Sequence, residues 1–576
     1  MLTLGLSNMR DAAAALVENG RIIAAAEEER FVRIKHVTAL PVHAIRFCLK
    51  AALVRLSDVD AVAVPWKYWQ LGRRATLAIG SMLRSPQLFM VKGARSAERL
   101  AHEWKELAFL RAYLSRHIDG TRCPPPVFLD HHLCHAASAM LVSPFERAAV
   151  LVVDGASEAH TTMLAQADLQ HIRVLKRIQL PHSLGQFYAA ITAYLGFIPD
   201  HDEYIVMGLA GYGEPRFAQV LRRQVLPSVA DGEFRLNTNL LDFHLARRRI
   251  FSPNFVSLFG PARVPEEEIT QRHRDMAASA QFVLEETLLH LARQLKKMTN
   301  EERLCLAGGV AYNCVANSRL WREAGFQEVY VPPAAGDSGA ALGAALWLTH
   351  RKGSLSERKV MRSAAWGPEF SEQACRAALE EAGLVVERLD DVTLCEKIAS
   401  ELAAGRLVFW FQGRMEWGPR ALGNRSLLAD PRREDIRALI NAKVKFREPF
   451  RPFAPSVLEE RAAEYFDLPG PSPFMLFTAP VRSSVKGVIP AVVHVDGSAR
   501  VHTVDPDSNP RYRLLLETFA RRTGVPVLLN TSFNVHEPIV CTPHEAVRCF
   551  LRTEVDWLVM ENLLARRPVT RHKVED

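Results

Sequence analysis

The chain has 576 residues, more than one hydrophobic core supports, so we expect two or three domains. Hydrophobic residues make up 48% of the chain and charged residues 24%, which is typical of a globular protein and excludes a disordered one. No apolar run approaches the roughly 18 residues that a membrane helix needs. We expect no signal peptide either, because Arg10 and Asp11 interrupt the first apolar stretch.

The net charge of +8 raises the question of a nucleic-acid partner. The basic residues are dispersed, however, and no block of five or more lysines and arginines occurs. We therefore expect a small anionic substrate, with no nucleic acid and no membrane as partner. The nine cysteines form no C-x-x-C pair, which predicts free thiols and a cytoplasmic location.

The first 30 residues predict a short buried strand followed by a hairpin. Residues 2–7 have the pattern of the buried strand, and the apolar run 12–17 leads into Glu-Asn-Gly-Arg, a hairpin signal, before the strand-like residues 22–26. The charged run 27–30 follows. Two interpretations of this run stay open: a solvated helix start or part of a functional motif.

Two histidines four residues apart, His131 and His135, stand at the start of a strongly helix-forming run. Positions i and i+4 share one helix face, so both imidazoles can reach the same ion. The spacing resembles the zincin pair, but the Glu of H-E-x-x-H is absent, which argues against a metalloprotease. A hydrogen-bonded core pair stays open as the alternative.

Two aspartates extend this candidate metal set. Asp154 ends the apolar strand 149–153, and Asp337 precedes a Gly/Ala-rich stretch that predicts a helix over 340–350. Taken singly, each is typical of a helix cap or a turn. Two imidazoles and two carboxylates together suit Fe²⁺, Zn²⁺ or Mn²⁺ far better than Mg²⁺.

The order of these elements favours an α/β fold, the two-lobed actin-like ATPase fold. The pattern is strand and hairpin at the start, strand-Asp-Gly at 149–155, and strand-Gly-Gly-helix around 306–310. In that fold two ribonuclease-H-like lobes hold a nucleotide between glycine turns, which makes Gly155, Gly308 and Gly309 candidate nucleotide contacts. The charged stretch 351–365 predicts a linker, so we expect domains at 1–350 and 366–576.

The second half is rich in cations shaped for phosphate. Gly413-Arg414, the run 418–426, Lys443, Lys445, Arg447 and Arg451 fall within 40 residues, and Arg500 adds another cation. Arginine binds phosphate bidentately, whereas lysine supplies a mobile point charge. A polar turn at 530–534 can hold an acyl phosphate or ribose. A solvated basic face would explain dispersed charge but not the Gly-Pro-Arg and Arg-Pro-Phe-Ala-Pro motifs, so we favour anion binding.

Nine motifs spread over the chain form a specific set. They are Ala-Ala-Ala-Glu-Glu-Glu-Arg-Phe at 24–31 with Lys35 and His36, His-His-Leu-Cys-His-Ala-Ala-Ser-Ala at 131–139, Val-Val-Asp-Gly at 152–155, Ser-Leu-Gly-Gln-Phe-Tyr at 183–188, Met-Gly-Leu-Ala-Gly-Tyr-Gly at 207–213, Ala-Gly-Gly-Val-Ala-Tyr-Asn at 307–313, Gly-Pro-Arg-Ala-Leu-Gly at 418–423, Arg-Pro-Phe-Ala-Pro at 451–455 and Leu-Asn-Thr-Ser-Phe-Asn at 529–534. Together they resemble the O-carbamoyltransferases of the NodU/CmcH family nearly end to end.

The resemblance implies two linked reactions. A YrdC-like α+β C-terminal domain would make carbamoyl-adenylate from carbamoyl phosphate and ATP, with Mg²⁺, releasing phosphate and pyrophosphate. The N-terminal domain would pass the carbamoyl group to a hydroxyl of a small acceptor beside a metal, typically Fe²⁺. The implied acceptor is a secondary metabolite, as in antibiotic biosynthesis. The acceptor's identity and the oligomeric state, including a homodimer, stay open.

The resemblance also assigns residues by motif. The implied metal ligands are His131, His135, Asp154 and Asp337. The implied carbamoyl phosphate and ATP pocket comprises Arg420, Lys445, Arg447, Arg451, Arg500, Asn530 and Ser532. From these, Lys445, Arg420 and Arg500 join Asp11 as candidate catalytic residues, and Asn313 joins the glycines as a nucleotide contact.

Two positions depart from the family's pattern, and both lie in the transferase half. Arg10 replaces the usual histidine of the first turn, and Ile205 replaces a usual lysine. A guanidinium accepts no proton at neutral pH, so Arg10 is expected to bind an acidic acceptor or the adenylate phosphate instead. We expect the acceptor contacts in 66–123 and 225–268, where no motif is recognisable.

Three alternatives remain for the function. One is a fused tRNA threonylcarbamoylation enzyme, which would bind tRNA with a steep salt dependence. The second is an adenylate-forming protein whose degenerate transferase half serves as a scaffold or sensor. A sugar-kinase-like enzyme is the third, and it accounts for neither the histidine pair nor the Arg-rich second half.

Overall fold

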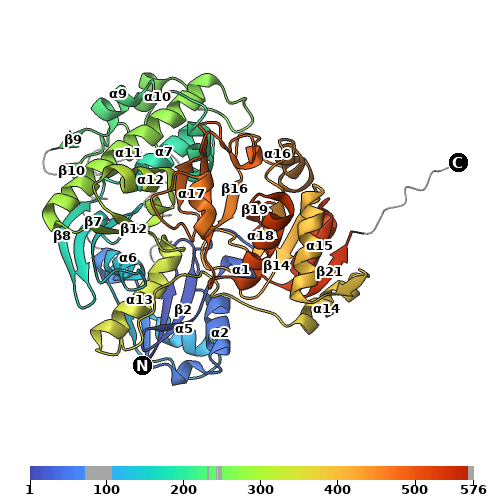
Figure 1. Ribbon diagram of the computed structural model, residues 1–576. Coiled ribbons are helices and arrows are strands. Elements are labelled where there is room, and N and C mark those ends of the chain that lie inside the picture. The colour runs from blue at the N-terminus through green and yellow to red at the C-terminus, as the bar shows by residue number, and fades with distance from the viewer. Residues whose placement is uncertain (72–106, 230–232, 242, 244–249, 568–576) are drawn as a thin grey trace. The chain divides into compact units, whose positions relative to one another are not determined.

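A computed structural model describes residues 1–71, 107–229, 233–241, 243 and 250–567 (Figure 1). The chain forms two compact units. The first comprises Met1–Glu28 and His36–Met361, and the second comprises Glu29–Lys35 and Arg362–Asp576. A seven-residue piece near the N-terminus therefore belongs to the second unit. The predicted acceptor-contact stretches 66–123 and 225–268 lie partly outside the described residues, and the domain limits 1–350 and 366–576 stay a prediction.

The first sheet of unit 1 has the strand order β3-β2-β1-β4-β5. Its strands are β1 Leu2–Ser7, β2 Ala13–Glu18, β3 Arg21–Glu27, β4 Ala61–Val64 and β5 Pro126–Phe128. β1, β2 and β3 pair antiparallel, and β4 and β5 continue parallel to β1. Asn19 and Gly20 have φ angles of 52° and 99°, the left-handed conformation that a tight hairpin needs, so the predicted hairpin is confirmed.

The second sheet of unit 1 repeats that topology. Its order, β12-β11-β6-β7-β8, has the same pattern of antiparallel and parallel pairs as the first sheet. The strands are β6 Arg147–Val153, β7 His160–Asp168, β8 Ile172–Gln179, β11 Arg303–Ala307 and β12 Glu328–Tyr330. Two sheets of one topology are what the expected pair of ribonuclease-H-like lobes requires. The sequence shows no repeat that would have revealed the duplication.

Two helices form the layers between these sheets. α13 Asp337–Arg351 packs against β1 and β2, α6 His131–Met140 packs against β11 and β6, and the two helices pack against each other. At Gly343 of α13 a Cβ atom would lie 1.9 Å from the carbonyl oxygen of Cys134 in α6. The close helix contact therefore needs a glycine at this position.

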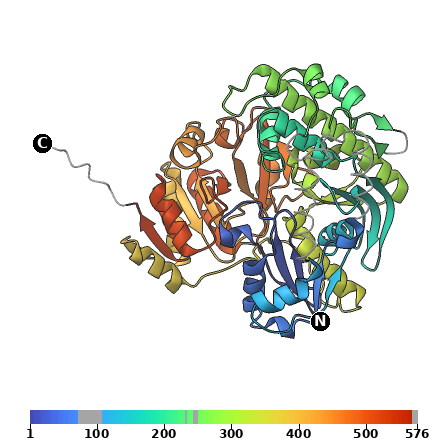
Figure 2. The same ribbon diagram turned by 180° about the vertical axis from the view of Figure 1, so that it is seen from behind.

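The remaining helices of unit 1 cover the outer faces. α2 packs on β2 and β3 of the first sheet (Figure 2), and α11 packs with α7, α8 and α12 (Figure 1). The elements are α2 Val42–Ala51, α5 Leu110–His117, α7 Leu184–Tyr194, α8 Glu203–Ala210, α9 Ala218–Val220, α10 Pro253–Phe259, α11 Gln271–Thr299 and α12 Cys314–Glu323, with a small β9 Ser228–Val229 and β10 Glu233–Phe234 hairpin.

Unit 2 is built on one mixed nine-stranded sheet in the order β13-β21-β20-β14-β15-β19-β16-β18-β17. The strands are β13 Val386–Arg388, β14 Val408–Phe411, β15 Arg425–Ala429, β16 Ala454–Leu458, β17 Phe477–Pro480, β18 Ser498–Val504, β19 Val527–Ser532, β20 Trp557–Met560 and β21 Leu563–Arg566. The helices are α1 Glu29–Val32, α14 Glu372–Glu381, α15 Asp391–Ala403, α16 Ile436–Ile440, α17 Ala462–Tyr465, α18 Pro510–Thr523 and α19 Pro543–Arg552.

Alternating side chains of this sheet feed two separate cores. In β14, Val408 and Trp410 join the core under α15 and α18, whereas Phe409 and Phe411 join the core under α14, α16 and α19. Figure 1 shows α15 and α18 lying side by side. The protein is therefore mixed α/β throughout, and the YrdC-like assignment of unit 2 is taken up below as a proposal.

The charged run 27–30 is not a solvated helix start. Glu27, Glu28 and Arg30 are 4%, 3% and 4% exposed. The interpretation as a solvated helix start is therefore wrong. Buried charges of this kind persist only where partners compensate them.

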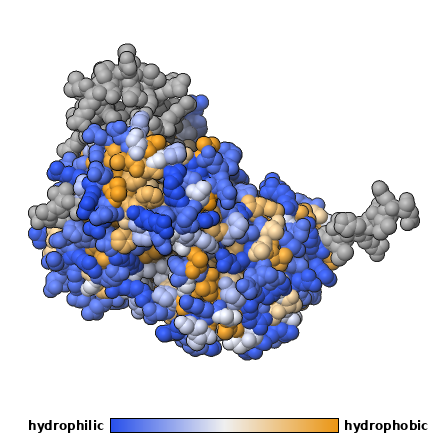
Figure 3. All heavy atoms as spheres, turned by 90° about the horizontal axis from the view of Figure 1, so that it is seen from above, coloured by the Kyte–Doolittle hydropathy of each residue, from blue (hydrophilic) through white to orange (hydrophobic). Residues whose placement is uncertain are grey.

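None of the helices in the described ranges combines the length and the apolar composition needed to cross a bilayer. On the face shown in Figure 3, hydrophilic residues surround the hydrophobic ones.

Candidate metal centre and anion site

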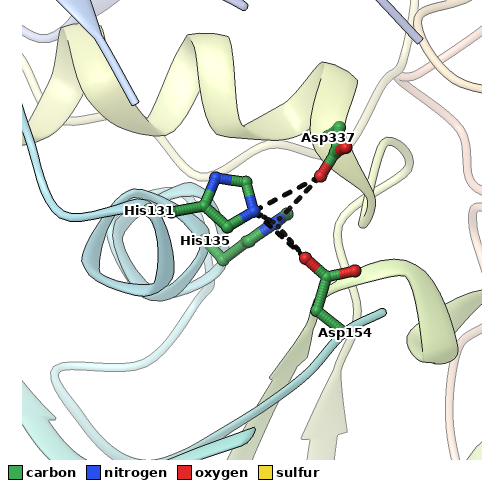
Figure 4. A group of neighbouring side chains, drawn as sticks. All are labelled: His131, His135, Asp154 and Asp337. Carbon is green, nitrogen blue, oxygen red and sulfur yellow. Dashed lines mark hydrogen bonds and ion pairs between the residues drawn. The ribbon is translucent and has the colours of Figure 1, made fainter. Parts of the chain in front are cut away.

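Three elements of unit 1 end at one point and bring four side chains together (Figure 4). α6 begins at His131, where Asp130 caps the helix by accepting a hydrogen bond from the Leu133 N–H at 3.1 Å. Asp154 directly follows β6, and Asp337 is the first residue of α13. The four side chains predicted as metal ligands therefore converge.

Their donor atoms are close enough to share one ion. The Nε2 atoms of His131 and His135 are 3.1 Å apart, and Asp154 Oδ2 lies 3.0 Å from the first and 3.4 Å from the second. Asp337 Oδ1 lies 3.4 Å and 3.5 Å from the same two nitrogens. An ion with bonds of about 2.0–2.2 Å separates neighbouring ligand atoms by roughly 3.0–3.5 Å, so the spacing fits.

The hydrogen bonds also orient the imidazoles for a cation. His131 Nδ1 lies 3.0 Å from the Pro65 carbonyl oxygen, which only accepts, so Nδ1 carries the proton. The Nε2 lone pair then faces the carboxylates. Burial disfavours the charged imidazole, but the hydrogen bond with Asp154 and the nearby Asp337 carboxylate outweigh it and hold the pKa of His131 well above its usual range. A positive charge at Nε2, from a proton or a metal, is what this arrangement favours.

Two buried atoms at the site have no hydrogen-bond partner among the described residues: His135 Nδ1 and Asp337 Oδ1. A buried acceptor without a donor costs free energy unless a ligand satisfies it. Asp337 Oδ1 is one of the four converging atoms. Together with the two-nitrogen, two-oxygen donor set, this fits a divalent transition metal.

The predicted glycine turns lie against Asp154. Its Oδ1 accepts hydrogen bonds from Gly155 N at 2.7 Å and Gly309 N at 3.3 Å. Gly308 has a φ of 91°, and a Cβ there would lie 2.3 Å from the Val153 carbonyl oxygen. Asn313 instead caps α12 and exchanges hydrogen bonds with Gln281. A nucleotide contact by these four residues stays a prediction.

The first turn holds an acid–imidazole pair that the sequence did not reveal. Asp11 has a φ of 57°, and its Oδ1 lies 2.6 Å from His36 Nδ1. The two are 25 residues apart, and nothing local in the sequence links them. Tyr312, whose ring lies against Gly336 beside Asp337, is also within electrostatic reach of Asp11.

The two family departures lie close to this pair. Arg10 Nη1 lies 3.5 Å from Asp200 Oδ1, and Ile205 is buried in α8. The His36 ring meets His201 edge-to-face with centroids 4.5 Å apart. Burial raises the pKa of Glu203 to about 7, although Arg10 and His36 oppose the shift. Arg10 thus already has an acidic partner within the chain.

Lys445 is the centre of the candidate anion site in unit 2. The side chain is 2% exposed, and Nζ donates to Ser532 O at 2.6 Å, Asn534 O at 2.8 Å and Asn534 Oδ1 at 2.9 Å. Burial, and then the charges of Arg447 and Arg451, hold the pKa of Lys445 well below its usual range. Burial and the neighbouring guanidiniums both disfavour the charged form of Lys445, and a bound anion would favour it, which fits an anionic ligand.

The other predicted pocket residues lie on neighbouring strands and loops. Arg500 is in β18 beside β16, and Ser532 ends β19. Asn530 Nδ2 donates to Ala421 O at 3.1 Å and Ser456 Oγ at 3.0 Å, which ties the turn carrying Arg420 to β19. Asn530 Oδ1 is buried without a partner in the described part of the chain and could accept from a ligand N–H.

Comparison with known proteins gave two family matches. "Carbamoyltransferase N-terminus" matches residues 2–346, and "Carbamoyltransferase C-terminus" matches residues 399–567. The chain is 41% identical to Uncharacterized protein sll1178 of Synechocystis sp., covering 100% of this chain and 98% of that relative. It is 40% identical to Nodulation protein NolNO of Sinorhizobium fredii, over 97% of this chain and 79% of the relative.

Solved structures gave only distant similarity. The activator of the 2-hydroxyisocaproyl-CoA dehydratase from Clostridium difficile with bound ADPNP aligns with 63% of this chain and 100% of its own, at 14% identity and a TM-score of 0.32.

Proposed function

The chain belongs to the carbamoyltransferase family, and we propose that it is an ATP-dependent O-carbamoyltransferase acting on a hydroxyl of a small natural-product acceptor. The observation that carries the proposal is the pairing of two sites: four metal-type donor atoms in one unit and a buried cationic cluster in the other. In this proposal unit 2 is the YrdC-like part, which takes carbamoyl phosphate, ATP and Mg²⁺.

The first half-reaction forms carbamoyl-adenylate at the cationic cluster. Carbamoyl phosphate loses its phosphate to water, and the resulting carbamate oxygen attacks the α-phosphorus of ATP while the bond to pyrophosphate breaks. Lys445, Arg420 and Arg500 would stabilise the charge that develops on the phosphates, with Arg447, Arg451 and Ser532 holding the nucleotide. Asn530 Oδ1, the buried acceptor, suits the carbamoyl NH₂.

The second half-reaction moves the carbamoyl group in unit 1. The acceptor oxygen attacks the carbamoyl carbon, the bond to the adenylate phosphate breaks, and AMP leaves. His131, His135, Asp154 and Asp337 would hold a divalent metal, Fe²⁺ or a similar ion, whose chemistry is to polarise a bound oxygen. Around it the glycine turns at 155 and 308–309 fix the Asp154 carboxylate.

The proton of the acceptor hydroxyl needs a general base, and the guanidinium of Arg10 cannot serve as one. We assign it to the imidazole of His36, oriented by the 2.6 Å hydrogen bond to Asp11. Asp11 then acts by fixing the ring and by stabilising the imidazolium that forms. This assignment provides an imidazole near the first turn although the usual histidine is absent there.

A measurement of pyrophosphate with ATP, carbamoyl phosphate and Mg²⁺ tests the proposal. We expect wild type and Lys397→Ala to release pyrophosphate, and Lys445→Ala to lose about 100-fold or more. Lys397 is a control because it lies outside the predicted anion-binding set, is partly exposed and pairs with Glu387 at 2.5 Å. No carbamoyl phosphate-dependent pyrophosphate from the wild type, or equal rates in the two variants, would refute the first half-reaction.

A further inference from the structure

A segment from the N-terminal part of the sequence is built into unit 2. We call residues Glu29–Lys35 the crossing segment; it follows β3, yet its contacts place it in the second unit. Arg30 is 4% exposed, and Phe31 packs against Met415, Ile539 and Cys541. Arg30 and Phe31 thus anchor the segment in unit 2.

Arg30 holds the turn that carries Arg420. Its Nη2 donates to the carbonyl oxygen of Gly418 at 2.9 Å, and its Nη1 pairs with Glu29 at 3.0 Å. Gly418 has a φ of 104°, so the turn takes a conformation that other residues rarely adopt. The Gly418 carbonyl, two residues before Arg420, is thus fixed by the Arg30 guanidinium, which comes from the N-terminal part of the sequence.

The other end of the same turn is fixed by residues from the C-terminal part of the sequence. Glu416 Oε1 accepts from Leu422 N at 2.7 Å and Asn424 N at 2.9 Å, and Asn530 holds the Ala421 carbonyl. Arg420 therefore lies between two parts of the turn that are held by hydrogen bonds. Arg30 of the crossing segment holds the Gly418 carbonyl before it, and Glu416 and Asn530 hold residues 421–424 after it.

Arg33 extends the contact to the loop after β19. It donates to Ile539 O at 2.8 Å and Pro538 O at 2.5 Å, and it pairs with Glu545 at 3.3 Å. This loop is continuous with Asn534, whose backbone and side-chain oxygens bind Lys445. Two of the loops that carry the anion site thus contact the crossing segment.

We propose that Arg30 is a positioning residue for adenylate formation: through the Gly418 carbonyl it holds Arg420 in the geometry that the phosphates require. The inference rests on the proposed function, since it names what orients that site. It follows that a residue far from the C-terminal half in sequence controls the C-terminal half-reaction.

The test uses the full chain and three variants: Arg30→Ala, Arg30→Lys and the control Arg21→Ala. Arg21 lies nine residues earlier, is exposed and pairs with Glu18. We expect Arg30→Ala to lower kcat/KM for pyrophosphate formation about 100-fold, the usual cost of misplacing a catalytic group by about 1 Å. Added guanidinium ion should restore part of the rate, and Arg21→Ala should match wild type.

Amide hydrogen exchange gives a readout that is independent of the reaction. Peptides covering 418–425 should exchange faster in Arg30→Ala and not in Arg21→Ala. Unchanged kcat/KM in folded Arg30→Ala, or a loss without faster exchange at 418–425, overturns the inference. If Arg30→Ala does not fold, Arg30→Lys decides by the same two measurements. A wild type that makes no pyrophosphate refutes the proposed function, while the exchange data still judge Arg30.

Discussion

The candidate sites of the two units are suited to ligands of opposite charge. In unit 1, two carboxylates face two imidazoles, and a buried oxygen of Asp337 has no donor among the described residues. In unit 2, burial and the charges of Arg447 and Arg451 disfavour the charged form of Lys445. The first arrangement is completed by a cation and the second by an anion. The proposed function accordingly assigns metal-dependent transfer to the first site and phosphate chemistry to the second.

The two sites also differ in how they are held. The metal centre is formed by the ends of β6, α6 and α13, elements packed closely enough that Gly343 admits no side chain. The anion site is formed by loops, and part of its support comes from Arg30 and Arg33 of the crossing segment. Rigid elements position the first site, whereas the second depends on a piece of distant sequence.

The largest expected effect is on metal binding. Asp154→Asn removes a charged ligand, so we expect the purified variant to lose stoichiometric Fe²⁺ or Zn²⁺, an affinity loss of about 100-fold or more. Asp130→Asn is the matched control, because Asp130 caps the same helix and pairs with Arg177 but does not belong to the ligand set. Metal content by mass spectrometry distinguishes the two, and equal metal loss in both would contradict the assignment.

Replacing the imidazole paired with Asp11 tests the transfer step in unit 1. His36→Asn should slow AMP release by about 100-fold, the usual contribution of a general base, while the pyrophosphate formed in the first turnover appears at an unchanged rate. With water as the acceptor, both products are measured by chromatography in one reaction. A wild-type rate of AMP release in His36→Asn, or an equal loss in the first-turnover rates of AMP and pyrophosphate, would contradict the role of His36 in the transfer step.

Packing around the metal centre should be less tolerant than the periphery of unit 2. Gly343→Ala drives a Cβ into the Cys134 backbone, and we expect it to cost about 3 kcal/mol in unfolding free energy. Gly487→Ala is the control, since no atom lies within 4 Å of a Cβ built there. Urea unfolding measures both. Equal stabilities would show that α6 and α13 can separate without penalty.

The smallest effect concerns Glu203, whose folded pKa of about 7 exceeds the ordinary value of 4.5 because of burial. The folded state then binds more protons than the unfolded state between these values, so stability falls as pH rises from 4.5 to 7. Glu203→Gln should remove that decline and gain about 1 kcal/mol at pH 8. Thermal unfolding at pH 5 and pH 8 measures it, and parallel pH profiles would contradict the raised pKa.

The local elements of unit 1 followed from the sequence because their signals are local. The hairpin at Asn19-Gly20, the helix starting at His131 and the strand before Asp154 depend on turn conformation, propensity and hydrophobic runs. The four candidate ligands were grouped by chemistry, and the structure brings them together. Metal binding itself stays a prediction.

Long-range partners could not be read in the same way. Nothing local shows that His36 meets Asp11 or that Arg30 reaches Gly418, since these contacts span 25 and 388 residues. The charge run at 27–30 is compatible with solvent when read from the sequence alone, because all four of its side chains are charged. Only the tertiary fold supplies the carbonyls that allow Arg30 to be buried.

The central claim is that the two units perform separable half-reactions. Pyrophosphate formation by metal-free, folded Asp154→Asn tests it most directly, with ATP, carbamoyl phosphate and Mg²⁺ supplied. The account predicts a wild-type rate for the first turnover of this variant, while Lys445→Ala retains its metal and makes no pyrophosphate. A rate that falls in proportion to the lost metal would contradict the separation of the two sites.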